Sequence, residues 1–350
     1  MILIVILAAA IWWGGNAIGL SRRLRIGLLA LIYVAILINL ALMPESARIL
    51  NGSAGEWLVL GGAALLALGY LRGLAWVRKR TRDPQPAPDL AGPFNRQELE
   101  RYARHIVLRE VGGAGQKRLK DARVLIIGAG GLGAPVLQYL AASGVGTLGI
   151  IDDDLVENSN LQRQVIHRTD MIGQPKVASA AQAMQALNPD IAIKTYQRRF
   201  CADIADELLQ DYDLVLDGTD NFDTRFAANS AAVRARKPLI SGALAQWEGQ
   251  VSVFDPAAGG PCYRCVFPKA PADGLAPSCA EAGVISPLPG VIGSMMALET
   301  VKVITGAGTT LRGRMLIYDG LYGDTRVITL KKRADCPDCG GGTGKVEPLG

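Results

Sequence analysis

The chain lacks net positive charge outside its first 83 residues. Residues 1–83 hold nine lysines and arginines against three aspartates and glutamates, whereas the rest of the 350-residue chain holds 28 basic and 29 acidic residues. The isoelectric point of about 8.9 therefore reflects the N-terminal segment. A nucleic-acid-binding domain needs a basic face, and the charge counts of residues 84–350 give no sign of one. We therefore expect no nucleic-acid partner, and the length allows one large domain with an appendage.

Charge is also missing from residues 1–10 and sparse in three apolar runs. A cleaved signal peptide would begin with a basic segment, which residues 1–10 do not have. The apolar runs cover residues 2–20, 24–43 and 57–77, and each can cross a hydrocarbon core of about 30 Å as a helix. We therefore expect a membrane segment over residues 1–83 with about three transmembrane helices, two spans being the alternative.

The basic residues flank these runs unevenly. Arg22, Arg23 and Arg25 stand at the first connection and four more follow the third run at residues 78–82, whereas the second connection has no net positive charge. By the positive-inside rule, we expect the protein in the inner (cytoplasmic) membrane, with its N-terminus outside and its catalytic domain facing the cytoplasm. Residues 84–93 contain four prolines and are interpreted as a linker, and residues 341–350 as a flexible tail.

Apolar runs of strand type alternate with helical patterns from residue 94 onward. The strand-type runs cover residues 124–127, 147–152, 191–196, 214–217 and 239–241, and the helical patterns cover residues 132–142, 176–187, 202–209 and 224–235. This alternation predicts an α/β domain over residues 94–340 with a Rossmann-like, mostly parallel sheet and helices on both faces. Runs at residues 250–254, 315–318 and 325–330 are expected to be later antiparallel strands.

A glycine-rich turn connects the first of these strands to the first helix. Gly128, Gly130, Gly131 and Gly133 stand in the strand–turn–helix context that a nucleotide-binding loop requires. Such a loop lets the backbone approach a phosphate, and the helix N-terminus presents free N–H groups to the anion. Asp152 ends the next strand, where a carboxylate can bind ribose hydroxyls of either ATP or NAD.

Two cations favour ATP over NAD as the nucleotide. Arg163 and Lys176 follow the glycine loop closely, and a dehydrogenase needs no clustered cations on the phosphate chain. Adenylation attacks the α-phosphate and expels pyrophosphate, so fixed cations must stabilise negative charge on both groups. The pair therefore favours ATP, although an NAD-dependent oxidoreductase remains an alternative.

Six motifs, three of them additional to these features, occur in a fixed order. They are RYAR at residues 101–104, GAGGLG at 128–133, NLQRQ at 160–164, GQPK at 173–176, DGTDN at 217–221 and CYRC at 262–265. In this order they resemble the MoeB/ThiF/HesA family, relatives of ubiquitin-activating enzymes. The resemblance implies ATP-dependent adenylation of the C-terminal glycine of a ubiquitin-like sulfur carrier, MoaD-like or ThiS-like, for molybdopterin or thiamine biosynthesis.

The resemblance also implies roles for single residues. Arg163 and Lys176 match residues that contact the triphosphate, and Asp220 matches an aspartate that holds Mg²⁺. Arg104 matches an arginine that reaches into the partner protomer's site, which implies a homodimer. Cys279 matches a cysteine that joins covalently with the carrier in some relatives and is dispensable in others.

Further positions are assigned less specifically. Asn160 and Gln162 are expected to complete the nucleotide contacts, and Arg225 matches a family position of vaguer role. His105 and His167 match no catalytic position, and we interpret them as packed or exposed side chains. No rhodanese-like sulfurtransferase domain is recognisable, so we expect a separate protein to donate the sulfur.

The cysteines predict a metal site. Cys262, Cys265, Cys336 and Cys339 form two CxxC pairs, which is the spacing of a tetrahedral zinc site with four protein ligands. Because no coordination position is left for a substrate, the Zn²⁺ is expected to be structural, with a redox CxxC pair as the alternative. Cys201 is interpreted as structural.

Two functional alternatives to sulfur-carrier activation remain open. One is adenylation-type activation of a tRNA base substituent, against which the near-neutral domain and the two CxxC pairs count. The other is a nucleotide-binding membrane scaffold without catalysis, against which the presence of all the expected site residues counts. Carrier-dependent pyrophosphate exchange would separate the proposed activity from both.

Overall fold

The computed structural model of the chain describes residues 2–43, 53–82, 92–271 and 282–340. Contacts divide the chain into two units, residues 1–91 and residues 92–350. The predicted Pro-rich linker lies largely, and the predicted tail and Cys279 lie entirely, outside the described residues.

The N-terminal unit is entirely helical where it is described. The first stretch consists of α1 (Ile2–Ala9), a π-helical turn (Ala10–Gly14) and α2 (Gly15–Ala17). Two long helices follow, α3 (Arg22–Leu42) and α5 (Ala54–Arg82). Almost no residue of the apolar parts of α3 and α5 is buried, and both parts are long and apolar enough to span a membrane.

The first predicted span differs from the other two. Its helix ends at Ala17 and is interrupted by the π-helical turn, so it is shorter than the roughly 20 residues needed to cross a bilayer core. Two contacts fix this unit internally. Arg25 donates to the carbonyl of Trp12 at 2.8 Å and lies over its ring, and the Tyr33 hydroxyl donates to the carbonyl of Trp57, which joins α3 to α5.

The second unit is built on one eight-stranded sheet with the order β3-β2-β1-β4-β5-β6-β7-β8. The strands are β1 (Arg123–Ile127), β2 (Thr147–Ile151), β3 (Ala192–Tyr196), β4 (Leu214–Asp217), β5 (Leu239–Ala245), β6 (Glu248–Phe254), β7 (Arg314–Asp319) and β8 (Asp324–Thr329). The first five strands pair in parallel, and β6, β7 and β8 are antiparallel. The predicted fold class is therefore confirmed for this unit.

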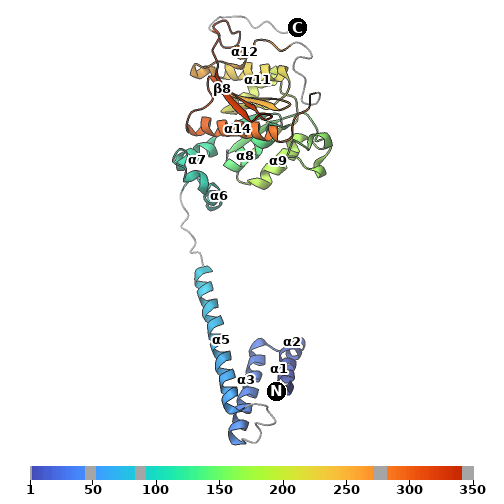
Figure 1. Cartoon of the computed structure of the whole chain (residues 1–350), viewed down its shortest axis with the longest axis vertical. Helices are drawn as coiled ribbons and strands as arrows, with labels where there is room; N and C mark the ends of the chain where they lie inside the picture. Colours follow the sequence, from blue (N-terminus) through green and yellow to red (C-terminus); the bar gives the residue numbers. More distant parts are fainter. Residues whose placement is uncertain (1, 44–52, 83–91, 272–281, 341–350) are drawn as a thin grey trace. The chain divides into compact units, whose positions relative to one another are not determined.

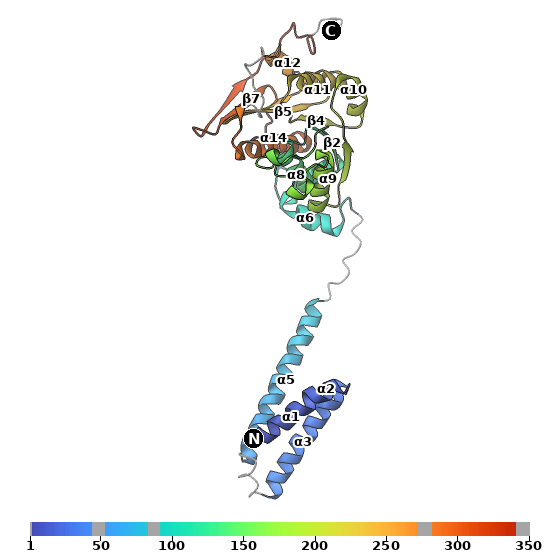
Figure 2. The same ribbon diagram turned by 90° about the vertical axis from the view of Figure 1, so that its right-hand side faces the viewer.

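Helices cover both faces of the sheet (Figure 1). Alternate residues of a strand point to opposite faces, so Val124 and Ile126 of β1 belong to one apolar core and Leu125 and Ile127 to another. The first core contacts α8 (Gly133–Ser143), α9 (Lys176–Leu187) and α14 (Pro287–Thr305). The second contacts α10 (Ala202–Gln210) and α11 (Phe222–Ala235), which lie on the other side of the strands in Figure 2.

The long apolar helix α14 belongs to this core rather than to a membrane. Its length and composition would allow a span, but half of its apolar part is buried inside the unit. Leu288, Ile292 and Met296 pack against β5, β6 and α8. A short helix, α12 (Tyr263–Val266), follows β6 and begins at Cys262.

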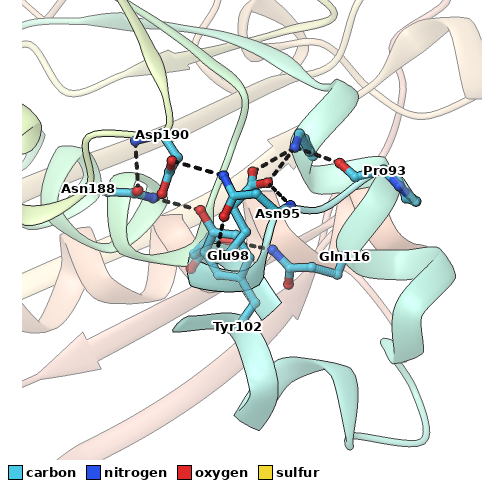
Figure 3. Close-up of polar contacts among 9 residues, drawn as sticks. Pro93, Asn95, Glu98, Tyr102, Gln116, Asn188 and Asp190 are labelled. Atoms are coloured by element: carbon cyan, nitrogen blue, oxygen red, sulfur yellow. Dashed lines mark hydrogen bonds and ion pairs between the residues drawn. The ribbon is translucent and has the colours of Figure 1, made fainter. Parts of the chain in front are cut away.

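A helical hairpin opens the second unit (Figure 3). Its helices are α6 (Arg96–Ile106) and α7 (Gly112–Asp121). Asn95 and Glu98 cap α6 reciprocally, each accepting the backbone N–H of the other at 2.8 Å. The side chain of Asn188 donates to the Tyr102 hydroxyl at 2.8 Å and so ties α6 to the segment that follows α9.

Candidate active site

A cleft of about 870 Å³ lies at the carboxyl ends of β1, β2 and β4. Ligands of parallel α/β sheets bind at this edge, where the strand order reverses, and here β1 lies between β2 and β4. Eight residues predicted from the sequence as nucleotide contacts line the cleft: Gly128, Gly130, Gly131, Asp152, Asn160, Arg163, Lys176 and Asp220. The fold therefore brings together residues that are up to 92 positions apart in the sequence.

The glycine loop is shaped by its backbone requirements. Gly128 has a φ of +93°, a conformation that side chains with a Cβ rarely adopt. Gly133 lies behind the loop rather than in the cleft, and a Cβ there would lie 2.0 Å from the Gly128 carbonyl oxygen. Gly133 thus permits the close turn from β1 into α8, and its role is structural support of the loop.

The peptide groups on both sides of Ala129 are held in place. The Ala129 N–H donates to the Asp152 carboxylate at 2.7 Å. Its carbonyl lies 2.9 Å from His167 Nε2, so Nε2 carries a proton and donates to it, while Nδ1 accepts from the Ser179 hydroxyl at 2.9 Å. Burial lowers the pKa of His167 below its usual value, which favours this neutral form. The sequence indicated no role for His167. In the structure its side chain holds the glycine loop in place through the Ala129 carbonyl.

Asp152 has a second backbone bond, from the N–H of Asp154 at 2.8 Å. Burial raises the pKa of Asp152, although Lys176 and the two backbone N–H groups oppose this shift. The carboxylate is thus oriented at the end of β2 and lines the cleft, as a ribose-binding carboxylate must.

The two predicted cations approach the cleft from different elements. Arg163 donates to the Ser159 carbonyl at 3.2 Å and to the Asn160 side chain at 3.1 Å, which orients its guanidinium group. Lys176, the first residue of α9, is 5% exposed and pairs with Asp154 at 2.7 Å. Both cations are therefore held in position before any ligand binds, which is the arrangement that electrostatic stabilisation of a phosphoryl transition state requires.

A buried network positions Asp220. Asp217 is fully buried, accepts from the N–H and hydroxyl of Thr219, and lies 3.6 Å from the guanidinium of Arg225. Arg225 in turn donates to the Thr219 carbonyl and, at 2.9 Å, to the Gly242 carbonyl. The loop is therefore fixed around Thr219, and Asp220 follows it with an exposed carboxylate at the cleft. No definite role for Arg225 followed from the sequence, and in the structure its guanidinium group fixes this loop through Thr219 and Asp217.

Two further expected site residues, Gln162 and Arg104, do not line the cleft. Gln162 is exposed and does not line the cleft, whereas Gln164 of the same motif is 4% exposed and does line it. The Gln162 side chain, predicted as a nucleotide contact, is therefore not among the described residues that line the cleft, although its neighbour Arg163 and Gln164 are. Arg104 is exposed on α6 and does not line the cleft of its own protomer. Cys279 lies outside the described residues.

The four predicted metal ligands gather at one point. Sulfur atoms lie 3.8 Å apart for Cys262 and Cys265, 3.5 Å for Cys262 and Cys336, and 3.3 Å for Cys265 and Cys339. Tetrahedral Zn–S bonds of about 2.3 Å place the sulfur atoms about 3.8 Å apart. The four thiols therefore fit a Zn²⁺ ion, for which each side chain offers one ligand atom within 4.8 Å of the others.

Asp338 connects the cysteine cluster to α11. Its carboxylate accepts from the side chains of Asn229 at 2.6 Å and Ser230 at 2.8 Å, and it pairs with Arg264 at 3.2 Å. α11 begins directly after the loop that carries Asp220. The contacts of Asp338 therefore connect the cysteine cluster to the helix that follows this part of the cleft. None of the four cysteines is among the described residues that line the cleft.

The chain is similar to known proteins over most of its second unit. The model of the ThiF family matches residues 102–338. The chain is 49% identical over 251 residues to a sulfur carrier protein adenylyltransferase of Thermus thermophilus, covering 71% of this chain and 93% of that protein. It is 48% identical to the probable adenylyltransferase/sulfurtransferase MoeZ of Mycobacterium tuberculosis, covering 72% of this chain and 65% of that protein.

A third relative and two solved structures also match most of the chain. The SAMP-activating enzyme E1 of Haloferax volcanii is 45% identical, covering 72% of this chain and 93% of that protein. A crystal structure of PaaA has a TM-score of 0.60 at 26% identity, covering 76% of this chain and 83% of that one. Escherichia coli MccB with AMPCPP and MccA has a TM-score of 0.61 at 23% identity, covering 69% and 74%, and this likeness concerns the fold alone.

Proposed function

The chain belongs to the ThiF family, and on this premise we propose that it adenylates the C-terminal glycine of a ubiquitin-like sulfur carrier protein. Several of its curated relatives are named as adenylyltransferases, one of them a sulfur carrier protein adenylyltransferase. The observation that carries the proposal is the convergence of the glycine loop with Asp152, Arg163, Lys176 and Asp220 in one cleft. The carrier would be MoaD-like or ThiS-like, and the product would serve molybdopterin or thiamine biosynthesis.

The proposed reaction follows from the positions of these groups. A carboxylate oxygen of the carrier's terminal glycine attacks the α-phosphorus of ATP, and the bond from the α-phosphorus to the bridging oxygen breaks. Pyrophosphate leaves with the electron pair, and the acyl-adenylate remains. Arg163 and Lys176 stabilise the negative charge that develops on the phosphate oxygens. Asp152 binds the ribose hydroxyls. The backbone N–H groups of the glycine loop then face the phosphates.

A magnesium ion fits this arrangement through Asp220. Mg²⁺ is usually held by one or two carboxylates together with phosphate oxygens and waters, and Asp220 presents an exposed carboxylate at the cleft. When bound, the ion would neutralise charge on the triphosphate. We propose that sulfur for the later thiocarboxylate comes from a separate donor protein.

A homodimer completes the proposal. Arg104 is exposed on α6, outside its own cleft, and the neighbouring side chains of Val107 and Leu108 are 76% and 48% exposed. A second protomer that covered these apolar residues would bring Arg104 towards its cleft. Mixing Arg104→Ala with Asp220→Ala protomers tests this, because one site of the mixed dimer would hold both Arg104 and Asp220 and regain activity.

The N-terminal unit is proposed to anchor the enzyme in the cytoplasmic membrane, with the catalytic unit in the cytoplasm. The exposed apolar surfaces of α3 and α5 support this. The N–H and C=O groups of a helix are paired within it, which is the condition for crossing lipid. The family match begins at residue 102, so the anchor is an addition to the shared enzyme.

Pyrophosphate exchange tests the proposed activity. The full chain in detergent is incubated with ATP, labelled pyrophosphate and either a MoaD-like or a ThiS-like carrier. We expect label to enter ATP only with a carrier that keeps its terminal glycine, and the carrier that supports exchange identifies the pathway. Exchange that is equal with a carrier lacking this glycine would refute the proposal, and exchange with a tRNA would favour the alternative.

A further inference from the structure

Arg25, near the start of α3, is a cation that is built into the N-terminal unit. Its Nη1 donates to the Trp12 carbonyl at 2.8 Å, and its Cζ lies 5.1 Å from the centre of the Trp12 ring. Its aliphatic stem passes over Gly15, where a Cβ would lie 3.0 Å from Cδ of Arg25. These contacts hold the guanidinium group against the π-helical turn of residues 10–14.

The charge of Arg25 has no counter-ion among the described residues of this unit. Glu56 is the only acidic residue that the structure describes there, and its carboxylate accepts the Ser53 N–H at 3.0 Å, at the start of α5. The Trp12 carbonyl is the one hydrogen-bond acceptor that the described residues offer Arg25, and Nε is buried without a partner. Because a partly buried charge is costly when it is unpaired, this position favours an anion from outside the unit.

Two further arginines stand in the same turn of α3. Arg22 and Arg23 are exposed, and the first turn of the helix has no acidic residue. Arg22 and Arg25 are three positions apart and are therefore neighbours on one face, where like charges destabilise a helix. Cations near a helix N-terminus also oppose the helix dipole. This unfavourable arrangement becomes favourable when an anion binds between Arg22 and Arg25.

The apolar surface beside these arginines indicates that the anion belongs to a lipid. Beyond Arg25, α3 is apolar, and almost none of its apolar part is buried. Trp13, which follows the tryptophan that contacts Arg25, is 72% exposed. Tryptophan is enriched where the hydrocarbon core of a membrane meets the headgroups, and basic clusters beside a span attract anionic lipids. A phospholipid would thus place its phosphate at the arginines and its acyl chains along α3.

We propose that Arg25 and Arg22 together bind the phosphate of an anionic phospholipid at the cytoplasmic boundary of the membrane. Arg25 would donate from Nη2, because Nη1 is engaged with Trp12 and the buried Nε is closed to a ligand. Arginine suits this role because its guanidinium group can bond two acceptors at once. The proposal rests on the proposed membrane anchor and is independent of the chemistry in the cleft. It assigns a ligand to a part of the chain that precedes the family match, which begins at residue 102.

The test measures lipid binding by the full chain in an uncharged detergent. Phosphatidylglycerol, which is anionic, and phosphatidylcholine, which has no net charge, are titrated separately, and native mass spectrometry counts the lipids bound to each chain. We expect the wild type to prefer phosphatidylglycerol by about tenfold or more. Arg25→Gln should lower the affinity for phosphatidylglycerol about ten- to a hundredfold, the usual effect of losing a hydrogen bond to a charged group. Its affinity for phosphatidylcholine should change little.

Arg23→Gln is the matched control. It removes the same charge from the same turn, but successive residues of a helix are about 100° apart, so Arg23 and Arg25 lie on nearly opposite sides of α3. The affinity of Arg23→Gln for phosphatidylglycerol should stay within about twofold of the wild type. Arg22→Gln should lower this affinity about three- to fivefold. Because Arg22→Gln leaves the contacts between Arg25 and Trp12 intact, misfolding of the unit would not explain its effect.

Glycerol 3-phosphate tests whether the acyl chains matter, because it has the phosphate of the lipid without them. In tenfold excess over the lipid, it should not displace phosphatidylglycerol from the wild type. Displacement would assign the position to a soluble anion and overturn the proposal of a lipid site.

The variants decide the rest of the proposal. Equal losses of affinity in Arg23→Gln and Arg25→Gln would indicate diffuse attraction to a basic surface and would overturn the site, as would equal affinity of the wild type for the two lipids. The adenylation proposal would stand in each of these cases. Release of the full chain from membranes by carbonate would instead refute the proposed anchor, so the failures are distinguishable.

Discussion

Lys120 and Glu98 form an ion pair at 2.7 Å in which the carboxylate side chain is 3% exposed and the lysine side chain is 33% exposed. The same ammonium group donates to the Pro93 carbonyl at 2.6 Å and lies over the ring of Phe94. Glu98 also caps α6, the helix that carries Arg104 (Figure 3). One lysine therefore joins the first described residues of the catalytic unit to α6.

We expect Lys120→Met to destabilise the catalytic unit by about 3–5 kcal/mol, because it leaves a buried carboxylate without its partner. Lys117→Met is the matched control on the same helix, since Lys117 and its partner Asp121 are both more than half exposed. Exposed pairs contribute about 0–1 kcal/mol. Chemical denaturation of both variants measures the difference, and equal stability of the two would contradict a special role for Lys120.

We expect Arg163→Ala and Asp220→Ala each to lower carrier-dependent pyrophosphate exchange by about 10²–10³-fold, the usual effect of removing one preorganised charge from a reacting centre. Folding should be unaffected, because both side chains lie at the cleft rather than in the core. Arg168→Ala serves as control, since Arg168 is exposed and pairs with Asp170. If exchange in the two cleft variants stays within about threefold of the wild type, the adenylation proposal is wrong.

The sequence predicted the sheet well because its strands are short apolar runs between clear turn signals. All eight predicted strands exist, and their directions follow the expected change from parallel to antiparallel. Four α-helices among the described residues of the second unit, α6, α7, α12 and α14, were not predicted. α7 contains Gly112, Gly113 and Gly115, and α14 begins with Pro287, Pro289 and Gly290, residues of low helix propensity in a helix interior. Packing against the sheet outweighs that propensity, and proline is tolerated in the first turn.

The site was predictable where a motif fixes backbone position and less so where a turn decides direction. Gly128, Asp152, Lys176 and Asp220 follow or precede regular elements, and all four line the cleft. Gln162 and Gln164 lie in an irregular turn, where no periodicity tells which side chain points inward. The role of His167 was also hidden, because its partners Ala129 and Ser179 are 38 and 12 positions away.

We expect about one zinc ion per chain, bound by the four cysteines. Because metal binding and folding of such a site are coupled, a strong chelator should lower the melting temperature of the purified protein. Cys336→Ser should lose the metal, whereas Cys201→Ser should keep it, since Cys201 is exposed and outside the cluster. Elemental analysis decides the matter, and a zinc-free wild type would refute the site.

Stability should depend on pH through His167. Burial depresses its folded-state pKa below the usual 6.5, so between these two values the unfolded chain binds more protons than the folded one. Stability from this group is therefore complete above about pH 6.5 and is lost as the pH falls through that window, by at most about 1.4 kcal/mol per pH unit. Thermal unfolding at pH 7.5 and 5.5 should show a smaller difference in His167→Gln than in the wild type. An identical difference would contradict the assignment.

The N-terminal unit should act as an anchor and contribute nothing to the chemistry. The described residues that line the cleft lie between Ile127 and Pro289, and residues 92–350 form a compact unit of their own. A fragment that starts near Asp89 should therefore be soluble and retain full exchange activity with a free carrier. The full chain should resist extraction from membranes by carbonate, because α3 and α5 expose apolar side chains along their lengths.

Reporter fusions test the orientation of the same unit. Arg22, Arg23 and Arg25 at one connection place that side in the cytoplasm by the positive-inside rule. A reporter at Gly350 should then be cytoplasmic and one at Gly52 external. If the fragment folds but is inactive, the helices take part in catalysis or dimerisation. If the reporter at Gly350 is external, the cleft has no access to cytoplasmic ATP, and the adenylation proposal loses the substrate on which Arg163 and Lys176 are expected to act.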